Sequence, residues 1–90
     1  MIREQRIVHF TGRVQGVGFR YTTLRVSDGY EITGTVRNLP DGRVECKVEG
    51  SAEQIDAFLG ELGQRMSGFI HNQTQQTAPY SGRYVSFEIT

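Results

Sequence analysis

The chain of 90 residues lacks the features that mark several large classes of protein. It has a single cysteine, Cys46, so no disulfide can form within it, and this favours a reducing compartment. No segment approaches the ~20 consecutive apolar residues that are needed to cross a bilayer, and no signal-like apolar stretch is present. We therefore expect a cytoplasmic protein that does not associate with membranes.

An excess of charge of one sign is also missing. The 10 basic and 10 acidic residues give a formal net charge of zero, so no broad basic face is expected to hold nucleic acid. His9 and His71 are isolated in the sequence and Cys46 stands alone, so the spacing of metal ligands is absent. We expect no metal, no other cofactor and no nucleic-acid partner. The length predicts one domain over residues 1–90, which we expect to be a monomer.

What the sequence does contain is a glycine-rich junction from Gly12 to Arg20, with the letters G-R-V-Q-G-V-G-F-R. It joins the end of an apolar strand to the start of a predicted helix. Glycines at 16 and 18 let successive backbone N–H groups converge, and the helix N-terminus and the Arg20 guanidinium both favour an anion. The junction therefore predicts a phosphate site. Its expected ligands are Gln15, Gly16, Val17, Gly18, Phe19 and Arg20.

The junction is open to other interpretations. A dinucleotide-binding fingerprint needs a small residue where this chain has Tyr21, and a Walker loop needs a Gly-Lys-Ser/Thr sequence that is absent. The plainest alternative is a tight turn followed by a surface arginine.

Hydrophobic periodicity predicts the remaining elements. Strands are expected over residues 6–13, 32–39, 43–49 and 84–90, with an edge strand over 69–77 that is poor in apolar residues. The last strand is expected to place Val85, Phe87 and Ile89 on one face. The first helix is expected from Phe19 to about Asp28. The second helix is predicted to begin with a capping box of Ser51 and Gln54 and to extend to Met66.

This order of elements predicts an α+β fold of the ferredoxin-like split β-α-β type, with both helices on one face of a mixed sheet. The strand over 43–49 should lie antiparallel between the strands over 6–13 and 32–39. Those two strands then run parallel and end at the same edge, roughly 10 Å apart. The glycine-rich junction and Asn38 should therefore face each other across a gap wide enough for a phosphate and a water.

The junction and the later block G-T-V-R-N-L-P-D-G, from Gly34 to Gly42, resemble the two signature blocks of the acylphosphatase family, and the resemblance extends over essentially all 90 residues. It implies hydrolysis of the carboxyl-phosphate bond of an acyl phosphate by in-line attack of water, with inorganic phosphate as product and inhibitor. It also implies that Arg20 binds the phosphate and Asn38 orients the water. The chain departs from the family pattern at Thr35, where a bulky aromatic is usual, and at Glu31, where glycine is usual. The second departure suggests that the first helix ends early at Asp28 and Gly29, with Gly29 as a left-handed cap.

Two other functions share the fold class. An RNA-binding module would need stacking aromatics on a strand face that here carries Arg43, Glu45, Lys47 and Glu49. Acylphosphatase-like domains also occur at the head of long carbamoyl-phosphate-handling maturation factors, which continue into zinc-binding domains. Cys46 alternates with Val44 and Val48, so we expect it to be a core residue and not a nucleophile. We expect His9 to be a half-exposed surface residue.

Overall fold

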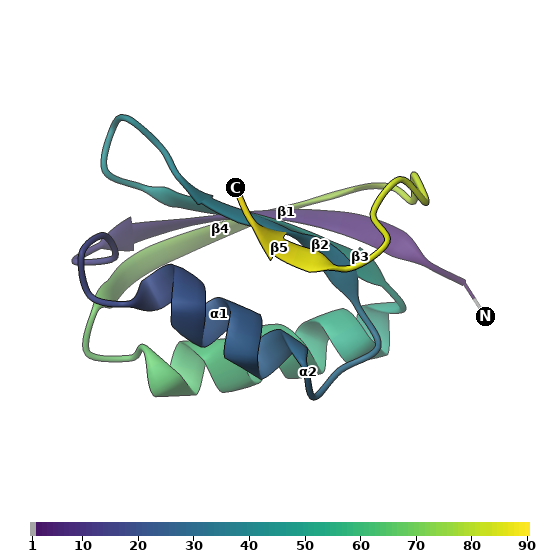
Figure 1. The fold of residues 1–90 in the computed structure, drawn as a ribbon, viewed down its shortest axis with the longest axis horizontal. Coiled ribbons are helices and arrows are strands. Elements are labelled where there is room, and N and C mark those ends of the chain that lie inside the picture. Colours follow the sequence, from purple (N-terminus) through teal and green to yellow (C-terminus); the bar gives the residue numbers. More distant parts are fainter. Residues whose placement is uncertain (1) are drawn as a thin grey trace.

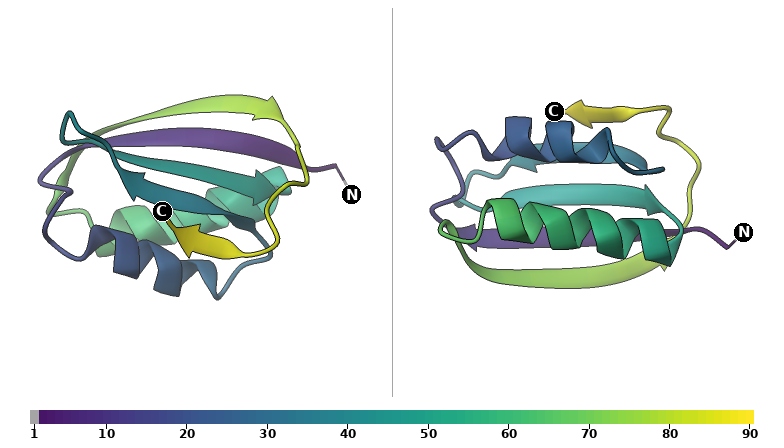
Figure 2. Two further views of the ribbon diagram at one scale, coloured as in Figure 1. Left: turned by 45° about the horizontal axis from the view of Figure 1, so that its top comes forward. Right: turned by 90° about the horizontal axis from the view of Figure 1, so that it is seen from below.

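The computed structural model describes residues 2–90, which form one five-stranded sheet covered on one face by two helices (Figures 1 and 2). The elements follow one another as β1 (Glu4–Gly12), α1 (Phe19–Ser27), β2 (Thr33–Asn38), β3 (Val44–Gly50), α2 (Ala52–Arg65), β4 (Ile70–Pro79) and β5 (Phe87–Ile89). The strand order in the sheet is β4-β1-β3-β2-β5. The predicted ferredoxin-like α+β arrangement is confirmed.

The central three strands decide where the two signature blocks lie. β3 is antiparallel to both β1 and β2, so β1 and β2 run in the same direction and end at one edge of the sheet. Val44, at the start of β3, pairs with Phe10 on one side and with Asn38 on the other. Asn38 therefore lies one strand away from the end of β1, as the order of elements predicts.

The core lies between the sheet and the helices. Its fully buried residues include Val8, Phe10, Val36 and Cys46 from the sheet, and the Phe19 ring of α1 packs with its centroid 5.0 Å from that of Phe10. Burial raises the pKa of the Cys46 thiol strongly, with Glu45 nearby as a second cause, so Cys46 stays a protonated core residue. This confirms the prediction made for it.

Helix α1 contains poor helix formers, and two of the polar ones, Thr23 and Ser27, are buried. The Thr23 hydroxyl donates a hydrogen bond of 2.8 Å to the carbonyl of Phe19, and the Ser27 hydroxyl donates one of 2.6 Å to that of Leu24. Each hydroxyl therefore finds its hydrogen-bond acceptor within the helix, and it can face the core without a partner from the sheet. Packing, and not helix propensity, holds α1 in place.

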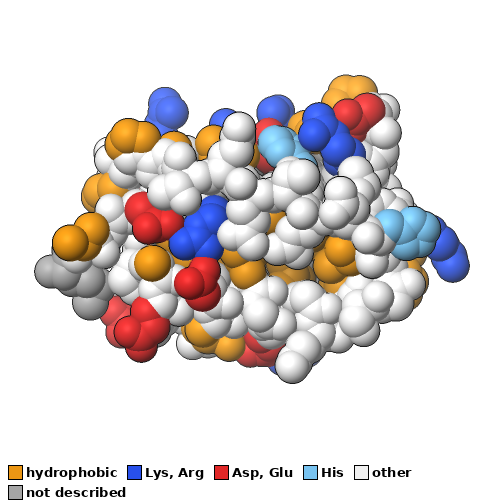
Figure 3. All heavy atoms as spheres, turned by 180° about the vertical axis from the view of Figure 1, so that it is seen from behind, with side chains coloured by type: hydrophobic (Ala, Val, Ile, Leu, Met, Phe, Trp, Pro, Cys, Tyr) orange, Lys and Arg blue, Asp and Glu red, His pale blue; other side chains and the backbone are white. Residues whose placement is uncertain are grey.

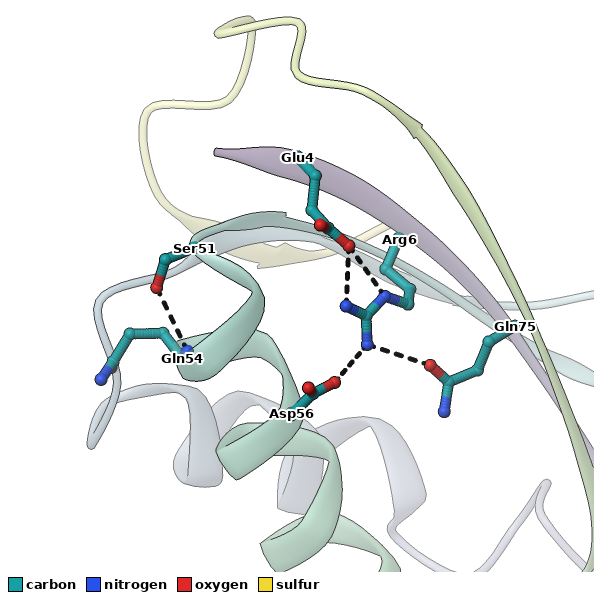
Figure 4. Close-up of polar contacts among 6 residues, drawn as sticks. All are labelled: Glu4, Arg6, Ser51, Gln54, Asp56 and Gln75. Carbon is teal, nitrogen blue, oxygen red and sulfur yellow. Dashed lines mark hydrogen bonds and ion pairs between the residues drawn. The ribbon is translucent and has the colours of Figure 1, made fainter. Parts of the chain in front are cut away.

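Helix α2 is fixed to the sheet by an ionic cluster around Arg6 (Figure 4). The Arg6 guanidinium is largely buried and donates to Glu4 on its own strand, to Gln75 on β4 and to Asp56 on α2. Burial alone would lower the pKa of Arg6, but the two carboxylates more than offset it and the pKa is raised. The cluster therefore joins three elements through one permanent cation.

Three local predictions need correction. Gly29 does not take a left-handed conformation. Asp28 caps the end of α1 with a φ of −62°, and the chain continues in a turn in which the N–H groups of Gly29 and Tyr30 donate to the carbonyls of Val26 and Ser27.

The predicted capping box is half formed. The Ser51 side chain accepts from the Gln54 N–H, but the Gln54 side-chain oxygen accepts from the Glu31 N–H instead of the Ser51 N–H. The last strand is limited to Phe87–Ile89, and Val85 is 93 % exposed, because only residues 87–89 pair with β2.

The other face of the sheet is polar. Glu45 bridges His9 at 3.0 Å and Arg37 at 2.9 Å, which places His9 half-buried on this face and Arg37 exposed. Glu49 accepts hydrogen bonds from Gln5, from the backbone and side chain of Ser81 and from the Gly82 N–H. Burial would raise the pKa of Glu49, but these donors outweigh it and the pKa is lowered. The connection between β4 and β5 is thus tied down over β3.

Candidate functional site

The chain leaves β1 through a loop whose shape depends on two glycines. Val14 is fully buried and anchors the loop, and the Arg13 N–H donates to the Phe69 carbonyl at 2.9 Å. Gly16 and Gly18 have φ values of 76° and 77°, in the left-handed region. A Cβ atom at either position would meet nothing within 4 Å, so these glycines are needed for the backbone conformation and not for space.

The N-terminus of α1 is left open, in contrast to that of α2. Helix α2 begins with the Ser51 side-chain cap and has Glu53 in its first turn. Helix α1 begins at Phe19, its N-cap residue Gly18 offers no side-chain cap, and its first turn has no acidic residue. The backbone N–H groups of residues 15–21 make no hydrogen bond to any of residues 2–90. Several donors and the positive end of the helix dipole therefore remain available to an anion.

The side chains of Arg20 and Asn38 meet at this helix end. Both line one hollow of about 140 Å³. Its other lining residues are Val14, Gly16, Gly18, Phe19 and Tyr21. Arg20 is partly buried, and its side chain makes no ion pair or hydrogen bond within residues 2–90. The structure thus brings together the two residues that the sequence predicts for catalysis, 18 positions apart in the chain.

Asn38 presents an unusual polar atom to the site. It is the last residue of β2 and shares the helix-facing side of that strand with Gly34 and Val36. Its side-chain oxygen Oδ1 is buried and accepts no hydrogen bond, and within the described chain it is the one buried side-chain polar atom in that state. Such an atom costs about 1–3 kcal/mol unless a partner satisfies it. The geometry therefore favours a donor from outside the chain at this point.

No carboxylate lines the hollow. The nearest acidic residue in the second block, Asp41, is bonded to the backbone N–H and the guanidinium of Arg43, which lowers its pKa. Within residues 2–90, no three His, Cys, Asp or Glu side chains are grouped as ligands of a metal ion would be. The fixed charge that faces the hollow is therefore that of Arg20, together with the α1 dipole.

The structure places Gln15 and Val17 differently from the rest of the predicted phosphate ligands, since neither lines the hollow. The Gln15 side chain reaches across to the hairpin between β2 and β3 and donates to the carbonyls of Leu39 at 2.8 Å and Arg43 at 2.9 Å. One amide thereby joins the loop to the hairpin that carries Asn38. Sequence reasoning missed this bridge, because no local pattern indicates which carbonyls an exposed glutamine will meet.

A larger hollow of about 280 Å³ lies elsewhere, bordered by Tyr30, Tyr84, Gln54 and residues of the β3 end. It contains neither Arg20 nor Asn38, and its one buried acid, Glu49, is already satisfied by four donors. The smaller hollow is therefore the better candidate site, because only there do unpartnered donors and an unpartnered acceptor converge.

Comparison with known proteins settles the family. Residues 6–89 match the family model of acylphosphatase. The chain belongs to the acylphosphatase family. It is 44 % identical over 80 residues to an acylphosphatase from Paenarthrobacter aurescens, a match that covers 88 % of this chain and 85 % of that protein.

Solved structures agree with this assignment. The acylphosphatase from Bacillus subtilis superimposes with a TM-score of 0.82 at 28 % identity, and the match covers 99 % of each chain. HypF from T. kodakarensis contains the same fold, with a TM-score of 0.83 and 30 % identity over 97 % of this chain and 12 % of its own. The acylphosphatases match this chain over most of their length, so its function is that of an acylphosphatase, a hydrolase of acyl phosphates. The predicted function is confirmed.

None of the helices among residues 2–90 is long and apolar enough to span a membrane.

The Gln15 bridge leads to a prediction on stability. We expect Gln15→Ala to lower the free energy of unfolding by about 1 kcal/mol, because two partly exposed hydrogen bonds are lost. Gln15→Glu should cost at least as much although it keeps the side-chain length, since a carboxylate cannot donate and would face two carbonyl oxygens. Urea unfolding followed by circular dichroism measures both. The matched control is Gln76→Glu on β4, where the glutamine is exposed and its side chain makes no hydrogen bond to any of residues 2–90. Equal stability of the two Glu variants would contradict the prediction.

Proposed function

We propose that the loop and Arg20 bind the phosphoryl group of an acyl phosphate and that Asn38 positions the water that attacks it. One observation supports this proposal above all: the buried, unpartnered Oδ1 of Asn38 borders the same small hollow as the unpartnered guanidinium of Arg20. The first group needs a hydrogen-bond donor and the second needs an anion. A water beside a phosphoryl group supplies both at once.

The reaction follows from these groups. The open N–H groups of the loop and the α1 terminus, together with the two-pronged Arg20, hold the phosphoryl oxygens and neutralise their charge. The water donates one hydrogen to Asn38 Oδ1 and directs a lone pair at phosphorus, opposite the bond to the acyl oxygen. The P–O bond forms as the P–O(acyl) bond breaks, and the carboxylate leaves with its electron pair.

Proton transfer needs no side chain of the protein. A carboxylate is a weakly basic leaving group, so it departs without protonation, and the proton of the attacking water passes to a phosphoryl oxygen. The hollow is lined by no His, Asp or Glu that would take it, and an amide is too weak a base. Positioning and electrostatic stabilisation therefore account for the catalysis.

The surroundings of the site fit a small enzyme working alone on a small substrate. The lone Cys46 is buried in the core, in keeping with a reducing cytoplasm. Acidic and basic side chains are interspersed over the face in Figure 3, so that face offers no single-sign patch to nucleic acid or to an anionic membrane. The enzyme is proposed to act as a cytoplasmic monomer on acyl phosphates, with inorganic phosphate as product and competitive inhibitor.

The activity itself gives the first test. We expect the chain to hydrolyse benzoyl phosphate in the presence of a chelator, since Arg20 and backbone N–H groups supply the positive charge at the phosphoryl group. A phosphate monoester should be hydrolysed far more slowly, because its alkoxide leaving group needs a proton that this site does not provide. Ultraviolet absorbance follows the reaction. Folded protein that leaves benzoyl phosphate intact would refute the proposal.

The role of Arg20 is tested by its substitution. Arg20→Ala should weaken inhibition by inorganic phosphate and remove most of the turnover, with a loss of about 2–5 kcal/mol, because the residue binds the phosphate in both the ground state and the transition state. Arg20→Lys should recover little, since an ammonium cannot make the two-pronged contact. Near-normal activity and phosphate affinity in Arg20→Lys would show that the assigned role is wrong.

Asn38→Ala should separate binding from positioning of the water. We expect kcat to fall by ~10²-fold or more while inhibition by phosphate stays nearly unchanged, because the amide acts on the nucleophile. Arg37→Ala is the control: it is the neighbouring residue on the opposite face of β2, paired with Glu45, and its effect should be small. Circular dichroism must show both variants folded. Loss of phosphate binding by Asn38→Ala to the extent seen for Arg20→Ala would contradict this division of roles.

A further inference from the structure

The size of the hollow limits what it can hold. At about 140 Å³ the hollow is smaller than the roughly 300–1,000 Å³ of pockets that enclose a whole ligand. A phosphoryl group and the attacking water fill such a space. The acyl part of the substrate must therefore lie at the mouth of the hollow, against whichever lining residue is exposed there.

Tyr21 is the large side chain at that mouth. It follows Arg20 in the first turn of α1, lines the hollow and leaves 69 % of its surface exposed. Two of the other three tyrosines have partners: Tyr30 packs against Phe58 and donates to Glu61, and Tyr80 stacks against Arg3. The third, Tyr84, is half-buried beside the larger hollow. Among residues 2–90, the Tyr21 side chain has no hydrogen bond, ring contact or cation contact. An aromatic face next to the site is thus available to a ligand.

The in-line geometry brings the acyl group to this ring. The acyl oxygen must lie opposite the water, and the proposed function places the water at Asn38, which enters the hollow from the sheet. The wall contributed by α1 consists of Phe19, Arg20 and Tyr21, and Phe19 is buried in the core against Phe10. Arg20 is engaged with the phosphoryl group. Tyr21 is then the side chain of α1 that remains for the acyl group.

We infer that Tyr21 is a specificity-determining residue, whose ring packs against the acyl group and favours acyl phosphates with an aromatic or other flat apolar acyl part over those with a small one. The inference rests on the proposed function. It concerns contact with the non-reacting part of the substrate, so it leaves the roles of Arg20 and Asn38 in the chemical step unchanged. Offset or edge-to-face packing of two rings supplies the preference.

The experiment compares benzoyl phosphate with acetyl phosphate on wild type, Tyr21→Ala and Tyr21→Phe. Tyr21→Ala should lower kcat/KM for benzoyl phosphate by about 3- to 10-fold, the range expected for loss of one aromatic pair. For acetyl phosphate the change should be about twofold or less, and inhibition by inorganic phosphate should not change. Tyr21→Phe keeps the ring and should behave as wild type on both substrates.

Tyr80→Ala is the matched control, because it removes an exposed tyrosine that does not border the hollow, and it should leave the ratio of the two kcat/KM values unchanged. The inference is overturned if Tyr21→Ala lowers kcat/KM equally for both substrates or for neither. It is also overturned if Tyr21→Phe behaves like Tyr21→Ala, because the hydroxyl and not the ring would then be responsible. These results leave the proposed function intact. A wild type that hydrolyses neither substrate would instead overturn the proposed function, and the inference with it.

Discussion

The site depends on the register of β3 between β1 and β2. Val44 pairs with Phe10 and with Asn38, which sets the end of β2 level with the end of β1 and aims Asn38 toward the helices. Because side chains alternate along a strand, a slip of one residue would send Asn38 to the polar face and bring Arg37 inward. The core prevents this slip, because it would also carry the fully buried Val36 of β2 out to the polar face. Ordinary hydrophobic packing therefore fixes the position of the amide.

The features that weaken the fold are concentrated at the hollow. Two loop glycines take left-handed conformations, one helix begins without a cap, an arginine has no partner, and a buried amide oxygen accepts no hydrogen bond. Each is unfavourable or neutral for the protein alone. Elsewhere polar groups are carefully satisfied, as Arg6 and Glu49 show. This contrast is what a binding site for a charged ligand requires, because groups already satisfied within the chain would have nothing left for a substrate.

How far the sequence predicts the structure varies with the range of the interaction. Alternation and glycine placement predict the strands, the topology and the meeting of Arg20 with Asn38, because these follow from periodicity and from the handedness of the crossover. The short β5 and the exposed Val85 were not predictable, since they depend on which residues find a partner strand. The conformation of Gly29 was not predictable either, since it depends on the turn that follows α1. The Gln15 bridge and the exposed Tyr21 ring were missed as well. The first depends on which distant carbonyls the Gln15 side chain reaches, and the second on which side chains are left without a packing partner after folding.

The absence of a general base from the lining has a consequence for how the site works. With no His, Asp or Glu among residues 2–90 lining the hollow to take a proton, the proposed reaction depends on how accurately two separate elements hold the phosphoryl group and the water. In the proposed function the loop and α1 hold the phosphoryl group and β2 holds the water, so the distance between them is a property of the fold and not of one motif. The Gln15 side chain connects the two elements, because it extends from the loop and donates both of its hydrogen bonds to the hairpin that follows Asn38. The loop and the hairpin therefore form one unit, although β3 separates their strands in the sheet.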